Sequence, residues 1–167
     1  MLRNLSALAL VLPLFLTGCA GKKKGAGGPG GADGDYVSGT PLPDRQEGVS
    51  FLGSNVDRNK FTPVLFDFDS TDVRGSERGK IESVAQFMRS GGSTVIIAGF
   101  TDERGTPEYN RGLGERRAQA VREAVIRAGG DGGKLQTVSF GAEMPADPGS
   151  SESAYARNRR AEFGVVR

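Results

Sequence analysis

Beyond residue 60 the chain alternates between apolar patterns of two different periods, and this alternation limits the folds that it can adopt. Runs rich in β-branched and aromatic residues are typical of strands, and apolar residues spaced i, i+3, i+4, i+7 are typical of helices. Strands are predicted over 64–68, 94–98, 135–140 and 161–166, and helices over 76–90, 107–128 and, as a short turn, 154–157. The order βαβαβ(α)β predicts a two-layer α/β sandwich with the helices packed on one mixed sheet.

Capping signals mark the expected ends of both long helices. Ser76 is the predicted N-cap of the first helix, and Thr106 followed by Pro107 marks the start of the second. Gly-Gly pairs at 91–92 and 129–130 are expected to end the two helices, because glycine readily adopts the left-handed conformation found there.

The usage of His, Cys and charged residues restricts the chemistry that is available. The chain has no His and one Cys, so it cannot form an intramolecular disulfide or a Cys-based zinc site. The absence of His also removes the commonest general base. A net charge of +2 gives no reason to expect a nucleic-acid partner. We therefore predict no catalytic residue, no metal and no cofactor.

The N-terminus is predicted to be a secretion signal with a lipid attachment site. An apolar run over 5–16 follows a basic residue, and it is shorter than the roughly 20 residues that span a bilayer. The sequence LTGC over 16–19 resembles the lipobox of bacterial lipoproteins, in which the Cys becomes the first mature residue and carries the lipid. By the same resemblance, Ala20 favours sorting to the outer membrane. We predict a signal peptide over 1–18 and lipidation of Cys19; the alternative is an ordinary signal peptide with an unmodified thiol.

Residues 20–48 are predicted to be a flexible tether. They are rich in Gly, contain three Pro and show almost no apolar periodicity. Such a composition cannot bury enough surface to offset the entropy lost on ordering. The predicted organisation is therefore a lipidated Cys and tether over 19–48, followed by a folded domain over 49–167.

Arg117 lies where the second predicted helix should present apolar side chains. At about 100° per residue, Leu113 and Val121 fall about 40° to either side of it. A guanidinium there must be paired or must lie at the edge of a cleft. Helical side chains lean toward the N-terminus, so Asp102 and Glu103 in the preceding loop are the candidate partners. Two interpretations stay open: a structural Arg–Asp bridge, or a site in which Asp102 binds an ammonium and Arg117 a carboxylate, suited to a zwitterionic amino-acid centre.

A long motif around this arginine carries a family resemblance. The sequences TDERGTPEYN over 101–110 and LGERRA over 113–118 resemble the signature of the peptidoglycan-associated lipoproteins, within the OmpA-like C-terminal domain family. FDFD over 66–69 and AYARNRR over 154–160 extend the resemblance to about residues 61–167. It implies the same α/β sandwich, non-covalent binding of peptidoglycan and no enzymatic activity.

The resemblance also implies a ligand, a set of site residues and partners. The family binds the diaminopimelate of the peptidoglycan stem peptide, and by resemblance Asp102 and Arg117 hold its zwitterionic end. Four further positions match residues that line the family's site: Asp69, Thr101, Arg104 and Asn110. Attachment to the periplasmic face of the outer membrane is implied as well. So is partnership with the Tol proteins, chiefly TolB, in envelope integrity and cell division.

Some residues depart from the family pattern or are expected to have a structural role. Phe100 and Phe140 stand where the family often has His and Tyr, which puts the shape of the cleft in question. We expect Asp67 to cap or bridge, and Arg159 and Arg160 to be structural or solvated rather than to contact ligand.

Parts of the sequence are also compatible with two other functions. Residues 67–71 also resemble the DxDx[ST] opening of haloacid-dehalogenase-type phosphatases, but no second acidic pair follows. The nearer alternative is an OmpA-like wall anchor of another envelope system, without Tol partners. It would use the same wall-binding site.

Overall fold

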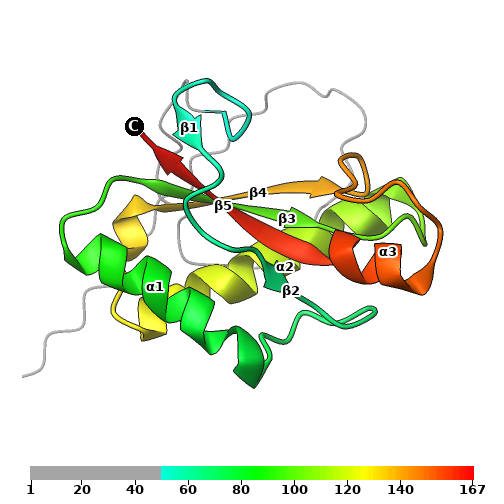
Figure 1. The fold of residues 1–167 in the computed structure, drawn as a ribbon, viewed down its shortest axis with the longest axis horizontal. Helices are drawn as coiled ribbons and strands as arrows, with labels where there is room; N and C mark the ends of the chain where they lie inside the picture. Colours follow the sequence, from blue (N-terminus) through cyan, green and yellow to red (C-terminus); the bar gives the residue numbers. More distant parts are fainter. Residues whose placement is uncertain (1–49) are drawn as a thin grey trace, which may run out of the picture. The chain divides into compact units, whose positions relative to one another are not determined.

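The computed structural model describes residues 50–167, whose elements are labelled in Figure 1. In chain order these are β1 (Val56–Asp57), β2 (Val64–Leu65), the 3-10 helix η1 (Gly75–Glu77), α1 (Arg78–Arg89), β3 (Val95–Phe100), α2 (Pro107–Arg127), the 3-10 helix η2 (Gly132–Lys134), β4 (Leu135–Gly141), α3 (Glu152–Asn158) and β5 (Arg160–Val166). The predicted signal peptide, Cys19 and the predicted tether lie outside the described residues. No helix within residues 50–167 is long and apolar enough to cross a membrane.

The strands form a five-stranded mixed sheet in the order β1-β5-β3-β4, and β2 also pairs with β5. Strand β3 runs parallel to β4 and antiparallel to β5, with Ile97 opposite both Thr137 and Phe163. Every residue of β3 is buried. A strand with neighbours on both sides and no polar alternation is expected at this position. The predicted α/β sandwich on one mixed sheet is confirmed.

Apolar side chains of β3 alternate between the two faces of the sheet. Val95 and Ile97 belong to the main core, together with apolar residues of α1 and α2. Ile96 and Phe100 belong to a second cluster that includes Phe51, before β1. Both long helices therefore cover one face of the sheet, and the N-terminal end of the described chain helps to cover the other (Figure 1).

Helix α2 approaches β3 closely at two glycines. A Cβ atom on Gly99 would collide with the backbone carbonyl of Gly114, and one on Gly114 would lie 2.9 Å from the carbonyl oxygen of Gly99. Only glycine fits at these two positions without a shift of the backbone. Since Arg117 follows Gly114 by about one helical turn, the contact brings its side chain to the end of β3.

The start of α1 differs from the prediction. Ser76 is not its N-cap, because it lies inside η1, and α1 begins at Arg78 without a side-chain cap. The buried carboxylate of Glu77 instead accepts hydrogen bonds from the backbone N–H of Leu65 (2.9 Å) and from Lys80 (2.8 Å). The carboxylate thereby ties α1 to β2, a long-range contact that a local capping pattern does not report.

The other predicted capping signals are confirmed. Thr106 is the N-cap of α2, where its side chain accepts a hydrogen bond from the backbone N–H of Tyr109, and Pro107 is the first helical residue. Gly91 and Gly129, which follow α1 and α2, adopt φ angles of +87° and +91°. These positive angles stop each helix at the expected place.

The predicted strand over 64–68 is only partly formed. Strand β2 has two residues. The backbone N–H of Phe66 still donates to the carbonyl of Arg159 (2.9 Å), but the chain then turns over residues 67–70. Asp69 lies in this 67–70 turn with a φ of +51°, the only positive φ of a non-glycine residue within 50–167.

Candidate ligand-binding site

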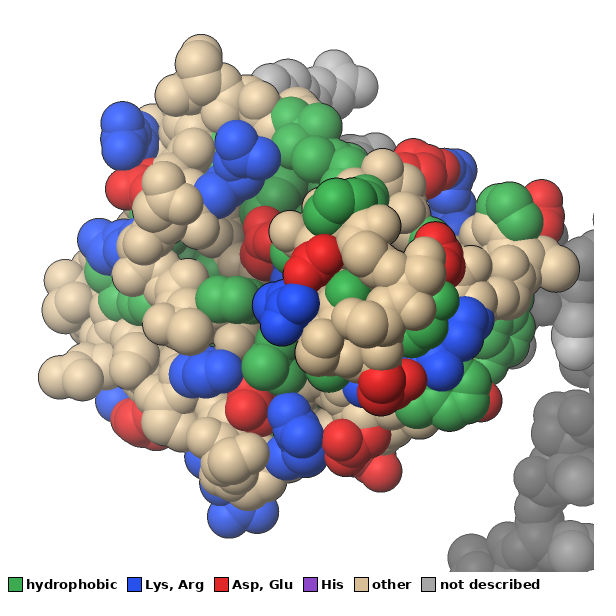
Figure 2. Space-filling view, turned by 45° about the vertical axis from the view of Figure 1, so that its right-hand side comes forward, with side chains coloured by type: hydrophobic (Ala, Val, Ile, Leu, Met, Phe, Trp, Pro, Cys, Tyr) green, Lys and Arg blue, Asp and Glu red, His purple; other side chains and the backbone are tan. Residues whose placement is uncertain are grey.

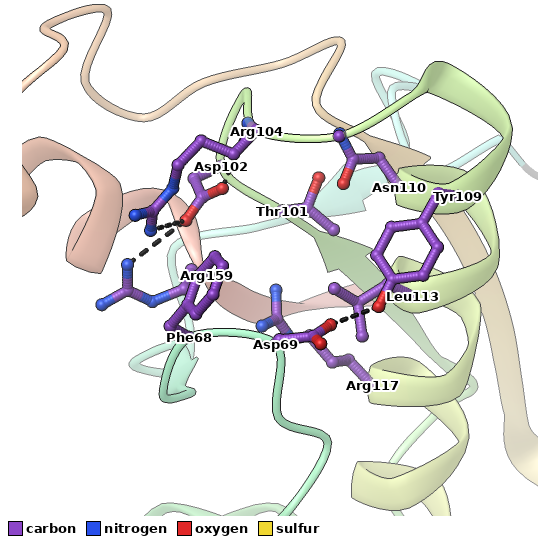
Figure 3. A pocket seen from close by; sticks show the side chains of 11 residues that line it. Phe68, Asp69, Thr101, Asp102, Arg104, Tyr109, Asn110, Leu113, Arg117 and Arg159 are labelled. Carbon is purple, nitrogen blue, oxygen red and sulfur yellow. Dashed lines mark hydrogen bonds and ion pairs between the residues drawn. The ribbon is translucent and has the colours of Figure 1, made fainter.

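A cavity of about 210 Å³ opens where four parts of the chain meet (Figure 3). These parts are the 67–70 turn, the loop between β3 and α2, the first half of α2 and the junction of α3 with β5. The lining residues are Phe68, Asp69, Thr101, Asp102, Arg104, Gly105, Tyr109, Asn110, Leu113, Arg117 and Arg159. All six predicted peptidoglycan-binding residues are among them, so the fold brings together side chains that are up to 48 positions apart in sequence.

Arg117 lies at the edge of the cavity with its side chain fully buried. Its guanidinium donates hydrogen bonds to three backbone carbonyls, those of Ser70 (2.9 Å), Asp67 (3.1 Å) and Phe100 (2.9 Å). None of the ion pairs among residues 50–167 involves it. The structural alternative, a direct bridge from Arg117 to Asp102, is therefore wrong.

The charge of Arg117 is retained in spite of its burial. Burial lowers the pKa of Arg117 to about 10, although the negative charge of Asp102 works against the shift. The group is therefore still cationic at neutral pH. Three of its five N–H donors are bonded to carbonyls, which leaves two for other acceptors. A buried cation without an ion-pair partner favours an anionic group in the cavity beside it.

Asp102 is held by two arginines. One carboxylate oxygen accepts hydrogen bonds from Arg104 (2.6 Å) and Arg159 (3.2 Å), and the other accepts from the backbone N–H of Arg104 (3.2 Å). Burial raises the pKa of Asp102, but these hydrogen bonds outweigh burial and keep the pKa below its ordinary value. Arg159 and Arg104 also pair with Glu152 (2.8 and 3.4 Å). This Asp102 cluster of Asp102, Arg104, Arg159 and Glu152 has two charges of each sign.

Asp69 presents a second carboxylate to the cavity. It accepts a hydrogen bond from the hydroxyl of Tyr109 on α2 (Figure 3). That bond raises the pKa of Tyr109. No Lys or Arg in the described part of the chain pairs with Asp69, which is exposed. It forms no direct ion pair among residues 50–167, but its negative charge acts on the buried guanidinium of Arg117 and favours the charged form of that group.

Two polar side chains at the cavity lack partners. The hydroxyl oxygen of Thr101 is buried and makes no hydrogen bond with any other residue of 50–167. Asn110 is only 2% exposed, and its side-chain amide makes no hydrogen bond to any other residue of 50–167. Buried polar groups nearly always have partners. Thr101 and Asn110 are therefore suited to hydrogen-bond a ligand.

Five cavity residues were not predicted from the sequence: Phe68, Gly105, Tyr109, Leu113 and Arg159. The ring of Phe68 is 60% exposed and covers the guanidinium of Arg104 at 4.2 Å. The sequence signal that could have indicated this role is the position of Phe68 between the two acidic residues of the FDFD motif. Arg159 was expected to be structural, and it does pair with Asp102 as well as lining the cavity. Its place depends on the pairing of β5, which no local pattern contains.

The residues that depart from the family pattern lie away from the cavity. Phe100 and Phe140 stack on each other in the second cluster, with ring centroids 5.4 Å apart. Arg160 faces the same side and lies over the ring of Phe100 at 3.9 Å. Neither phenylalanine lines the cavity, so the shape of the cleft does not depend on these two substitutions directly.

The two aspartates of the phosphatase-like pattern do not form a paired acidic site. The carboxylate of Asp67 pairs with Arg74 (3.2 Å), as expected for a bridging residue. The carboxylate of Asp69 is bonded to Tyr109 instead. Within residues 50–167, no group of three or more His, Cys, Asp or Glu side chains could hold a metal ion.

The molecular surface on this side is mixed in charge. Figure 2, in which the side bearing α3 comes forward, shows Lys and Arg side chains interspersed with Asp and Glu. No large patch of one sign covers this face, so specificity must come from the individual charges in the cavity rather than from a general surface field.

The comparison with known proteins agrees with the motif. A family model described as the OmpA family matches residues 65–159. The chain belongs to the OmpA family. The peptidoglycan-associated lipoprotein of Pseudomonas putida is 34% identical over 95% of this chain and 93% of its own length. The crystal structure of the peptidoglycan-associated lipoprotein from Burkholderia pseudomallei is similar at a TM-score of 0.60, with 40% identity over 63% of this chain and 89% of that one.

More distant structures share the fold. The C-terminal domain of MotB from Helicobacter pylori has a TM-score of 0.56 and 23% identity, over 62% of this chain and 82% of that one. The predicted resemblance to the peptidoglycan-associated lipoproteins is thus confirmed by sequence and by structure.

Proposed function

We propose that this chain is an outer-membrane lipoprotein that binds peptidoglycan non-covalently, without catalysis, through the diaminopimelate of the stem peptide. The cavity carries the proposal, because it combines the buried cation of Arg117 with carboxylates, the unpartnered hydroxyl of Thr101 and the side-chain amide of Asn110. The free end of diaminopimelate carries one ammonium and one carboxylate. Such a zwitterion matches both signs of charge. The shared name of the relatives, peptidoglycan-associated lipoprotein, supports the same ligand class.

The proposed roles follow from charge and hydrogen-bonding capacity. The two remaining N–H donors of Arg117 bind the ligand carboxylate. The ammonium lies on the acidic side of the cavity, near Asp69 and Asp102. Thr101 and Asn110 form further hydrogen bonds to the ligand. Arg104 packs on the ring of Phe68, and these two side chains form one wall of the cavity.

A competition experiment tests the ligand. Purified sacculi should pull down the full-length protein, and a free tripeptide that ends in diaminopimelate should compete. The matched tripeptide with lysine lacks only the distal carboxylate, so it cannot pair with Arg117 and should compete at least about tenfold less well. Equal competition by the two peptides would show that the zwitterionic end is not what the protein recognises.

The remaining part of the proposal concerns anchoring and partners. Cys19 carries the lipid, the predicted tether spans from the membrane to the wall, and the protein acts with TolB and other Tol proteins in envelope integrity and cell division. Identity of 34% over nearly the whole chain to a peptidoglycan-associated lipoprotein supports this role, whereas the likeness to MotB concerns the fold alone. Mass spectrometry that finds Cys19 unmodified would exclude the anchor. Failure to co-purify TolB after cross-linking in cells would exclude the Tol partnership.

A further inference from the structure

We infer that the outer edge of β4 pairs with β4 of a second copy of this chain, in an antiparallel arrangement that joins the two sheets. Strand β4 ends the sheet. It pairs with β3 on one side, and no strand within residues 50–167 pairs with its other side. An edge strand presents a row of backbone N–H and C=O groups, which is a template for another strand. The inference does not depend on which ligand the cavity binds.

Strand β4 lacks the features that usually prevent such pairing. It has seven residues with the sequence LQTVSFG, and it contains no Pro and no charged residue. Natural sheets protect their edges with short strands, charges, prolines or a covering element. Residues 136–140 are all partly exposed, so no element of the described chain covers them completely.

The opposite edge of the same sheet has this protection. It consists of β1 and β2, which have two residues each and pair with opposite ends of β5. The segment between them, 58–63, contains Arg58, Lys60 and Pro63. Of the two edges, β4 is therefore the one that presents a long and regular strand to another chain (Figure 1).

The residues of β4 are suited to pairing with themselves. In an antiparallel pair centred on Val138, Gln136 lies opposite Phe140 of the partner subunit, and Thr137 lies opposite Ser139 of the partner subunit. The side chains of Val138 and Phe140 pack on the second cluster and are only partly buried, so pairing would bury more of their apolar surface. Thr137 and Ser139 lie on the other face, where both bond to α2. Polar residues thus meet polar residues on the α2 face.

Charges at the ends of β4 favour the antiparallel direction. Lys134 directly precedes the strand, Glu143 follows it by two residues, and both are exposed. Antiparallel pairing brings the start of one strand beside the end of the other, so Lys134 approaches Glu143 of the partner subunit at both ends of the pair. Glu143 also pairs with Arg111, and a carboxylate can accept hydrogen bonds from two cations. A parallel pair would instead bring the two Lys134 side chains together.

Cysteine cross-linking of the full-length protein in cells tests the pairing. In Val138→Cys the two thiols would face each other, and directly opposite residues have Cα atoms about 4.5–5.5 Å apart, within the range of a disulfide. Mild oxidation should give at least about tenfold more disulfide-linked dimer than Gln86→Cys, because pairing raises the effective concentration of the thiols. Gln86 is exposed on α1, away from the edge. The wild type, whose one Cys is Cys19, gives the background.

A second pair of variants tests the register. Gln136→Cys and Phe140→Cys should cross-link to each other when the two are expressed together. Neither should cross-link to itself, because identical positions would lie four residues apart along the strands, about 13 Å. Circular dichroism checks that the purified variants are folded. Equal amounts of dimer from Val138→Cys and Gln86→Cys would overturn the inference. So would a cross-linked product that contains a different protein, since the edge would then serve another partner.

Discussion

The guanidinium of Arg117 makes three hydrogen bonds to backbone carbonyls, but no carboxylate forms an ion pair with it among residues 50–167. The three carbonyls orient it from three sides. Removing such a charge from water has a desolvation free energy that is unfavourable, and hydrogen bonds to carbonyls offset only part of it. A ligand carboxylate would supply the missing counter-charge. The burial of Arg117 therefore destabilises the protein without ligand and favours binding of a ligand that carries a carboxylate.

Replacing Arg117 by lysine separates charge from geometry. The lysine ammonium keeps the charge but is compact and cannot reach three carbonyls in different directions. At least one buried carbonyl would lose its partner, so Arg117→Lys should lower the free energy of unfolding by about 1–3 kcal/mol and abolish tripeptide binding. The exposed Arg116→Lys on the same helix should change stability by less than about 0.5 kcal/mol. Urea unfolding that gave equal values for the two variants would contradict this account.

The two arginine bonds of Asp102 predict a dependence of stability on pH. Hydrogen bonds to the ionised form keep the pKa of Asp102 below its ordinary value of 3.8 despite burial. A carboxyl with a lowered folded pKa contributes stability that is complete above the unfolded pKa and is lost as the pH falls through the folded pKa. The free energy of unfolding should therefore be level above about pH 5 and decline below about pH 4. Asp102→Asn should make this decline of the free energy of unfolding less steep. Asp72→Asn, which changes an exposed carboxylate, should leave the decline as it is. Urea unfolding across that pH range measures both variants.

Helix and strand ends that depend on neighbouring residues could be predicted from the sequence, whereas ends set by distant residues could not. Thr106 and Pro107 begin α2 as expected. The start of α1 instead depends on Glu77 bonding to Leu65 of β2, twelve positions away. Strand β1 precedes the first predicted element, and its two residues pair only with the far end of β5. The six proposed site residues could be predicted from the motif resemblance and from the position of Arg117 on its helix. Arg159 could be identified as a cavity residue only from the tertiary fold.

The contact between α2 and β3 predicts opposite effects for two glycines of one helix. A methyl group at Gly114 would meet the side chain of Ser139 and the backbone of Gly99, so Gly114→Ala must push α2 away from the sheet. Overpacking of this kind costs about 1–3 kcal/mol. At Gly112 the nearest atom is the mobile end of Arg116, 3.3 Å away, so Gly112→Ala should stabilise the protein by up to about 1 kcal/mol through helix propensity. Thermal melts of the two variants should shift in opposite directions, and a rise in both would mean that the helix can move freely.

For the whole molecule, the proposed function requires one chain to contact both the outer membrane and the peptidoglycan wall. The lipid would lie in the membrane, and the cavity would contact the wall. Residues 20–48, predicted to connect them, number 29 and could span at most about 95–105 Å when fully extended. As a Gly-rich coil their mean end-to-end distance would be about 30 Å. We therefore expect the length of this segment to matter and its order of residues not to.

A deletion and a scrambled variant test that expectation. Deleting 25–44 leaves nine residues of the segment, which span at most about 30 Å. Because the cavity is unchanged, this protein should bind purified sacculi as the wild type does, but it should cross-link poorly to peptidoglycan in intact cells. A variant with residues 20–48 scrambled at equal length should cross-link normally. Normal cross-linking by the short variant would show that reach is not limiting, and loss of binding by the scrambled variant would show that the segment makes specific contacts of its own.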